Sequence, residues 1–174
     1  MPVTQVQWLT QLNAVDLESI CDATAEAIQN GIGFDWIHLP PRARLEAYWR
    51  GVILVPDRML VVGRLDGVIA GTGQLVKPSA NNEAGAFNTI LSTFFVAPWA
   101  RGHGLARAML RDISGRARAE GFLQISLDVR ETQSAAIQLY EGAGFKRWGI
   151  KERYAKVGTK YIRGFFYAKD LTEP

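Results

Sequence analysis

Residues 94–106 read Phe-Phe-Val-Ala-Pro-Trp-Ala-Arg-Gly-His-Gly-Leu-Ala: an apolar run, a proline, a glycine-rich turn and the start of an amphipathic stretch. Gly102 and Gly104 lack a Cβ, so the backbone can approach a ligand closely and adopt unusual dihedral angles. The first N–H groups of a helix have no partner within the helix, and the helix dipole adds partial positive charge there. The stretch therefore predicts an anion site, to which Arg101 and Arg107 add cationic side chains.

Two other phosphate-binding patterns do not fit this chain. It contains no G-x-x-x-x-G-K-[ST] segment, and Gly102-His103-Gly104 is not followed by the third glycine of G-x-G-x-x-G. A second glycine pair, at residues 71 and 73, lies inside an expected strand, where it indicates a bulge or a close backbone contact.

The pattern on both sides of the turn predicts a mixed α/β chain in which one crossover helix packs on a sheet. Asp66-Gly67 is a strong hairpin signal, and Gly31 and Gly33 are expected to end the first helix. We expect helices over 16–30, 41–54, 104–120 and 134–141, and strands over 59–64, 68–76, 87–96, 123–129, from 145 onward and over 162–169.

Length and composition limit the classes of protein. The 174 residues, 48% of them hydrophobic, suit a single domain over 1–174. The formal net charge of +3 comes from scattered Lys and Arg without a basic run, which argues against nucleic-acid binding. We expect a cytoplasmic protein without a signal peptide or a membrane-spanning segment. Cys21 stands alone, so no intrachain disulfide can form, and we interpret it as a small buried hydrophobe on the first helix.

Two motifs together resemble one family. Arg101-x-x-Gly104-x-Ala106 resembles the [QR]-x-x-G-x-[GA] pyrophosphate loop of the GNAT superfamily of N-acetyltransferases. The expected strand at 123–129 and a Leu139-Tyr140-Glu141 segment with Gly144-Phe145 follow in the family's order. The resemblance covers roughly residues 60–150, and the two N-terminal helices fit the same topology.

The resemblance implies a central, mostly antiparallel, twisted sheet flanked by helices, with two splayed strands that hold acetyl-CoA. It assigns the acetyl donor to a site formed by the end of the long strand, the glycine turn and the turn before the last helix. The implied cofactor-binding residues are Phe94, Phe95, Val96, Arg101, Gly102, His103, Gly104, Leu105, Ala106, Arg107 and Gln133.

One position departs from the family pattern. Gln133 stands where the family usually has an Asn that contacts the cofactor arm and caps the next helix. Gln is a poor N-cap, because its longer side chain does not reach back to the N2 or N3 amide as Asn does. Its amide head keeps a cofactor contact open, and Thr132 and Ser134 are the alternatives for the cap.

The resemblance also implies catalytic residues. Tyr140 matches the family's general acid, which protonates the leaving thiolate; without the motif it would be a packing tyrosine. The long strand carries no acidic residue, so Asp128 is the best candidate for the base, with a turn or salt-bridge residue as an equal alternative. Ser92, holding a water, is the next candidate.

The acceptor is the most open question. The aromatic loop between the first two helices lines the acceptor site in this family, although its aromatics could equally anchor the loop in the core. The acceptor-binding candidates are Phe34, Asp35, Trp36 and His38.

A small primary amine, such as an amino-acid-like compound, is the favoured acceptor, because residues 33–52 weakly resemble bacterial enzymes that inactivate amino-acid-like toxins. A protein N-terminus or lysine is the alternative, and a catalytically silent CoA-binding module is the rival from another class. No metal spacing is present. The aromatic strand at 161–168 could pair in a homodimer or be buried within one chain.

Overall fold

The computed structural model describes residues 1–31 and 34–173; the expected helix stop at Gly33 lies outside them. Seven strands form one sheet in the order β1-β2-β3-β4-β5-β7-β6. Neighbouring strands are antiparallel except for β4 and β5, which confirms the mostly antiparallel sheet. The strands are β1 (Thr4–Leu9), β2 (Arg58–Leu65), β3 (Val68–Val76), β4 (Asn88–Val96), β5 (Gln124–Arg130), β6 (Lys146–Val157) and β7 (Lys160–Asp170).

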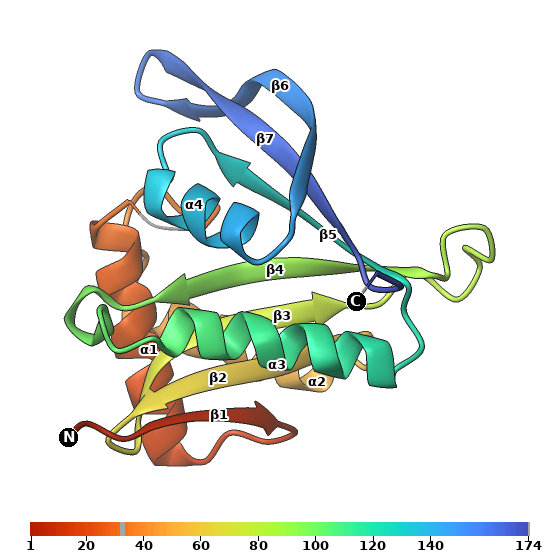
Figure 1. The fold of residues 1–174 in the computed structure, drawn as a ribbon. Coiled ribbons are helices and arrows are strands. Elements are labelled where there is room, and N and C mark those ends of the chain that lie inside the picture. The colour runs from red at the N-terminus through yellow and green to blue at the C-terminus, as the bar shows by residue number, and fades with distance from the viewer. Residues whose placement is uncertain (32–33, 174) are drawn as a thin grey trace.

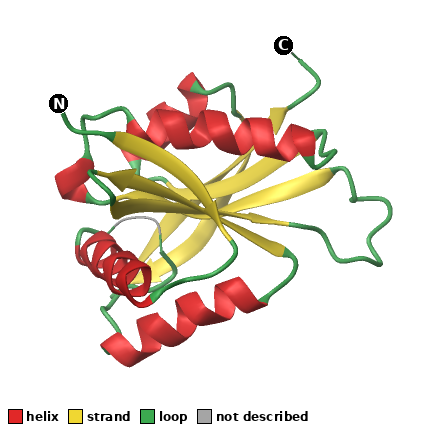
Figure 2. Ribbon diagram, turned by 90° about the horizontal axis from the view of Figure 1, so that it is seen from below, coloured by secondary structure: helices red, strands yellow, loops and turns green. Residues whose placement is uncertain are grey.

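Helices cover both faces of the sheet (Figures 1 and 2). One core cluster joins α1 and α2 to one face, and a second joins α3 and residues of α4 to the other. The helices are α1 (Ala14–Gln29), α2 (Arg42–Leu54), the 3-10 helix η1 (Pro98–Ala100), α3 (Leu105–Ala119) and α4 (Ser134–Gly142). Within the described residues, none of them is long and apolar enough to cross a membrane.

The apolar stripe of α3 explains how this helix is held. Leu105, Met109 and Ile113 recur every four residues and are almost fully buried against the sheet. Glycines on the facing strands make room for them: a Cβ on Gly63 would lie 2.6 Å from the Met109 sulfur, and a Cβ on Gly71 3.3 Å from the same atom. The Gly71 Cβ would also lie 2.7 Å from the Phe95 carbonyl oxygen of the neighbouring strand. The predicted close contact at the mid-strand glycines is therefore confirmed, and a register shift beside Thr72 adds the predicted bulge.

The buried cysteine has the structural role expected from the sequence. Cys21 lies on α1 with no exposed surface. Burial raises the pKa of its thiol to about 11, so the thiolate form needed for nucleophilic chemistry is scarce at neutral pH.

Two features near the chain ends complete the sheet. β1 was not predicted; it pairs with β2, and Trp8 Nε1 donates to Asp112 Oδ1 of α3 at 2.6 Å. β7 pairs with β5 on one side and β6 on the other, so both of its edges are used within the chain.

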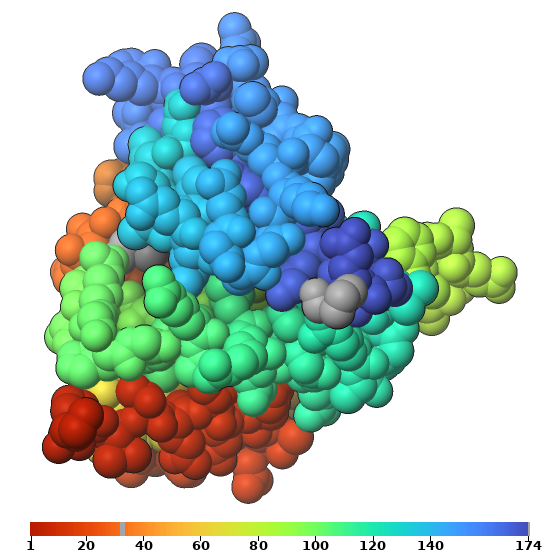
Figure 3. Space-filling view, viewed as in Figure 1, coloured from red at the N-terminus to blue at the C-terminus, as the bar shows by residue number. Residues whose placement is uncertain are grey.

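The segment 77–87 between β3 and β4 projects from the body of the molecule (Figure 3).

The parting of β4 and β5 positions the site. The two strands pair only from Asn88–Gln124 to Ile90–Ser126. Beyond that point β4 continues to Val96 along β3, and β5 continues to Arg130 along β7. The splayed strands expected from the family pattern are confirmed, and they leave backbone edges without a strand partner.

Candidate active site

The glycine turn opens onto a hollow at the start of α3. Gly102 and Gly104 have φ of 81° and 75°, in the left-handed region that favours glycine. A Cβ on either would meet no atom within 4 Å, so open space lies above the turn. Among the residues that the structure describes, no side chain caps α3, which leaves its first N–H groups available to an anion. The hollow measures about 420 Å³ and is lined by Val96, Ala100, Arg101, Gly102, Gly104, Leu105, Ala106, Arg107 and Leu139.

Two of the predicted cofactor residues turn their side chains elsewhere. His103 lies in the turn, and its Nδ1 is 3.2 Å from the Ala100 carbonyl oxygen. Phe95 is buried on the α1–α2 side of the sheet, with its ring 5.6 Å from that of Phe34. Neither side chain lines the hollow at the turn or the pocket between β4 and β5.

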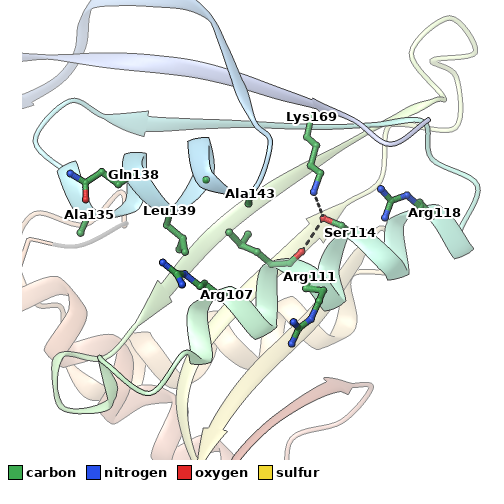
Figure 4. Close-up of a pocket in the computed structure, with 11 residues that line it drawn as sticks. Arg107, Arg111, Ser114, Arg118, Ala135, Gln138, Leu139, Ala143 and Lys169 are labelled. Carbon is green, nitrogen blue, oxygen red and sulfur yellow. Dashed lines mark hydrogen bonds between the residues drawn. The ribbon is translucent and has the colours of Figure 1, made fainter. Parts of the chain in front are cut away.

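A larger groove of about 710 Å³ runs between α3 and α4 (Figure 4). α3 contributes Arg107, Arg111 and Arg118, and Lys169 reaches down from β7 to place its Nζ 3.3 Å from Ser114 Oγ. Burial and the nearby Arg118 charge lower the pKa of Lys169. No acidic side chain is among the groove's described lining residues, so the groove is a cationic channel that adjoins the glycine turn through Arg107.

The predicted catalytic residues meet in a smaller cavity, here called the splay pocket, where β4 and β5 separate. It measures about 140 Å³. It is lined by Phe34, Asp35, Ile90, Leu91, Ser92, Thr93, Phe94, Asp128, Val129, Arg130, Gln133, Ala136, Tyr140 and Tyr154. Two predicted acceptor residues stand outside it: Trp36 stacks on the outer side of Phe34 at 5.7 Å, and His38 is exposed.

Tyr140 enters the splay pocket from α4. Its ring is 5% exposed and packs against Phe94 and Phe145 at centroid distances of 5.9 and 5.8 Å. Burial, and secondarily the Asp128 charge, raise the pKa of the phenol above its ordinary value. Tyr140 therefore stays neutral and keeps a proton that it can donate.

Tyr154 was missed by sequence reasoning. Its hydroxyl donates to the carboxylate of Asp128, and burial followed by this hydrogen bond raises the pKa of Tyr154. It projects from an irregular part of β6, where the pairing with β7 shifts register between Lys151 and Ala155. Gly164 on β7 makes room for it, because a Cβ there would lie 2.1 Å from Tyr154 Cγ. A glycine inside an aromatic strand was the available signal.

A buried polar network holds the β4 bulge in place. Thr93 has φ of 48°, a strained value for a β-branched residue. Gln74, which has no exposed surface, donates from Nε2 to Thr93 Oγ1 at 2.6 Å and to Tyr48 Oη at 3.0 Å. Thr72 Oγ1 donates to the Thr93 carbonyl at 2.8 Å, and Arg58 donates to Gln74 Oε1 at 2.8 Å. The network fixes the backbone next to Phe94.

Two side chains tie the loop after α1 to the pocket. Arg130 Nη2 donates to the Phe34 carbonyl, and Gln133 Nε2 donates to the Gly31 carbonyl. Gln133 is the N-cap residue of α4, but within residues 1–31 and 34–173 no side chain caps that helix, so neither Thr132 nor Ser134 supplies the cap. The amide of Gln133 serves the loop instead.

Comparison with known proteins agrees with this geometry. Residues 20–145 match the acetyltransferase (GNAT) family. The chain belongs to the GNAT family of acetyltransferases. A relative from Azospirillum brasilense, an uncharacterized N-acetyltransferase in the hisH-hisA intergenic region, is 54% identical over 128 residues, which are 74% of this chain and 76% of the relative.

Solved structures share the fold of this acetyltransferase. An N-acetyltransferase from Staphylococcus aureus superposes with a TM-score of 0.81 at 19% identity, covering 97% of this chain and 99% of the other. A phosphinothricin acetyltransferase from Sinorhizobium meliloti, in complex with acetyl-CoA, gives 0.76 at 22% identity, covering 97% and 88%. The parting of β4 and β5 and the uncapped start of α3 are thus parts of a GNAT fold.

Proposed function

We propose that this acetyltransferase moves an acetyl group from acetyl-CoA to a small primary amine bound in the splay pocket. Acetyl-CoA is the acetyl donor of the enzyme. The observation that carries the proposal is the meeting of Tyr140, Asp128 and Tyr154 in a cavity of only about 140 Å³. A cavity of this size favours a small acceptor over a folded protein surface.

The residues around the cofactor site fit acetyl-CoA in three ways. The unpaired edges of β4 and β5 suit the amides of the pantetheine arm. The open turn at Gly102 and Gly104, with the free N–H groups of α3, suits the pyrophosphate. The arginines and Lys169 of the groove between α3 and α4 suit the phosphorylated nucleotide end. Gln133, which donates to the Gly31 carbonyl and lines the splay pocket, would border the pantetheine arm at the start of α4.

The chain's own groups have distinct tasks in this proposal. When bound, acetyl-CoA supplies an acetyl group activated as a thioester. Asp128 accepts a proton from the acceptor ammonium, either directly or through one water, because only a neutral amine attacks a thioester. The Phe94 N–H, fixed by the bulge at Thr93, would donate to the acetyl carbonyl oxygen. As the amide C–N bond forms and the C–S bond breaks, Tyr140 would give its hydroxyl proton to the departing thiolate, and the second proton lost by the attacking nitrogen would restore the phenol.

An acceptor panel tests the proposal. CoA thiol release is measured with small primary amines, amino acids, polyamines, and peptides that offer a free N-terminus or a lysine. Turnover with small compounds well above that with any peptide is expected. A clear preference for peptides would favour a protein acetyltransferase, and acetyl-CoA binding without turnover on any acceptor would favour a silent CoA-binding module.

A further inference from the structure

The splay pocket holds charges of both signs that leave one another unpaired. Arg130, Asp128 and Asp35 all line it. In residues 1–31 and 34–173, neither carboxylate forms an ion pair with Arg130. Asp128 and Asp35 are exposed and Arg130 is half-buried, so a ligand that carries one positive and one negative group can complement the charges of both signs in the pocket.

The strand geometry sets the spacing of these charges. β5 alternates, with Leu127 and Val129 buried in the core and Asp128 and Arg130 on the opposite face. Residues two apart on a strand project from one face about 6.6 Å apart. One small molecule can therefore reach both side chains, with an ammonium group at Asp128 and a neighbouring anionic group at Arg130.

Arg130 is held in place but keeps donors for a ligand. Its Nη2 donates to the Phe34 carbonyl, which fixes the guanidinium at the pocket wall. A guanidinium carries five N–H donors in a rigid fork, so donors remain after this bond. A carboxylate is the anion that fits such a fork with two parallel hydrogen bonds.

We propose that the acceptor is an α-amino acid, whose free carboxylate binds Arg130 while its amino group lies at Asp128. This deepens, and rests on, the proposed acetyl transfer in the splay pocket. A peptide N-terminus lacks the free carboxylate next to its amine, so Arg130 also discriminates against peptides. Asp35, which also lines the pocket, adds a second carboxylate to it.

The test compares α-amino acids with their α-carboxamides, which have nearly the same shape but no negative charge. The measured quantity is the ratio of kcat/KM for the acid to kcat/KM for the amide, in wild type, Arg130→Gln and Arg130→Lys. Arg163→Gln is the control, because Arg163 lies on the neighbouring strand, pairs with Glu131 and does not line the pocket. Because the ratio compares two acceptors in the same variant, it cancels any general loss of activity that follows when the loop held by Arg130 moves.

Wild type should prefer the acid. Arg130→Gln should lower the ratio by about 10- to 100-fold, the loss typical of a hydrogen-bonded charge, while Arg130→Lys keeps part of it and Arg163→Gln all of it. An unchanged ratio in Arg130→Gln, or acetylation of other small amines but no amino acid, would overturn the inference and leave the proposed function standing. Acetylation of no small amine at all would overturn both.

Discussion

Among single residues, Tyr140 has the most specific proposed task, that of the general acid. Tyr140→Phe keeps the ring packed against Phe94 and Phe145 and removes the hydroxyl proton. We expect kcat to fall by about 10²–10⁴, as for a lost general acid, with acetyl-CoA affinity unchanged in a binding assay. Because the pKa of the buried phenol is raised, the wild-type acid stays protonated past pH 10, and kcat should show no alkaline fall below that pH. A Phe variant as fast as wild type would return Tyr140 to a packing role.

The role proposed for Asp128 is to take a proton from the acceptor ammonium, and a substitution can test it. Asp128→Asn can still accept the Tyr154 hydroxyl hydrogen bond, but it cannot take a proton from an ammonium. The acidic limb of the kcat/KM profile should move or vanish, the rate at neutral pH should fall, and high pH should partly restore it because more amine is already neutral. A wild-type profile with a normal rate would contradict this role and make Ser92, which also lines the pocket, the next candidate.

Sequence alone could predict the site residues that lie within one short motif. It could not predict residues that are far apart in the sequence and meet only in the fold. Tyr140, Phe94 and the turn glycines lie in short motifs, so sequence alone could name them. Tyr154 reaches Asp128 only because β6 lies beyond β7 and Gly164 leaves space. Gln74 meets Thr93 across two strands. Such contacts depend on strand register, which no local pattern fixes.

At the scale of elements, the β6–β7 hairpin carries Tyr154 into the site. Gly164→Ala places a methyl group where the Tyr154 ring now lies. The ring must move away from Asp128, so we expect kcat/KM for the acceptor to fall by about tenfold or more while acetyl-CoA affinity stays unchanged. Gly149→Ala on the same hairpin is the matched control, because its Cβ would lie 3.7 Å from Phe166 Cβ, an ordinary contact. Equal kinetics in the two variants would argue against a role for Tyr154.

The glycine turn before α3 is the second element under test. Acetyl-CoA should raise the Tm of wild type, because it binds only the folded state. Gly104→Glu should abolish that rise by placing bulk and negative charge in the open space above the turn. Gly121→Glu is the control: Gly121 also has a left-handed φ, of 88°, and open space around it, but it lies at the far end of α3. A full Tm rise in the Gly104 variant would disprove the assigned pyrophosphate site.

The elements themselves were largely predictable, with one gap. The alternation and helical spacing gave most strands and helices within a few residues. β1 was missed because its six residues, with Gln at two positions, form an edge strand that is exposed or half-buried along its length. Its place is set by pairing with β2 and by the contact of Trp8 with α3.

For the molecule as a whole, the features suited to the cofactor and the pocket suited to the acceptor lie in different places around the sheet. The α3–α4 side offers the turn and the cationic groove, and the splay between β4 and β5 leads to the pocket closed by the loop after α1. The parallel pairing that ends at Ile90–Ser126 is therefore the feature on which both proposed binding sites depend. Sequence predicted this arrangement through the family's motifs, whereas the acceptor side had no motif to reveal its charges.

In the proposed reaction, one molecule of acetyl-CoA reacts with one small amine in the splay pocket. The most direct measurement is the amount of CoA and of N-acetylated amine formed over time in one reaction, with wild type and with the accepted small amine. We expect the two products to appear in equal amounts, and neither to appear when the amine is left out. CoA released without acetylated amine, or no release from a protein that binds acetyl-CoA, would contradict it.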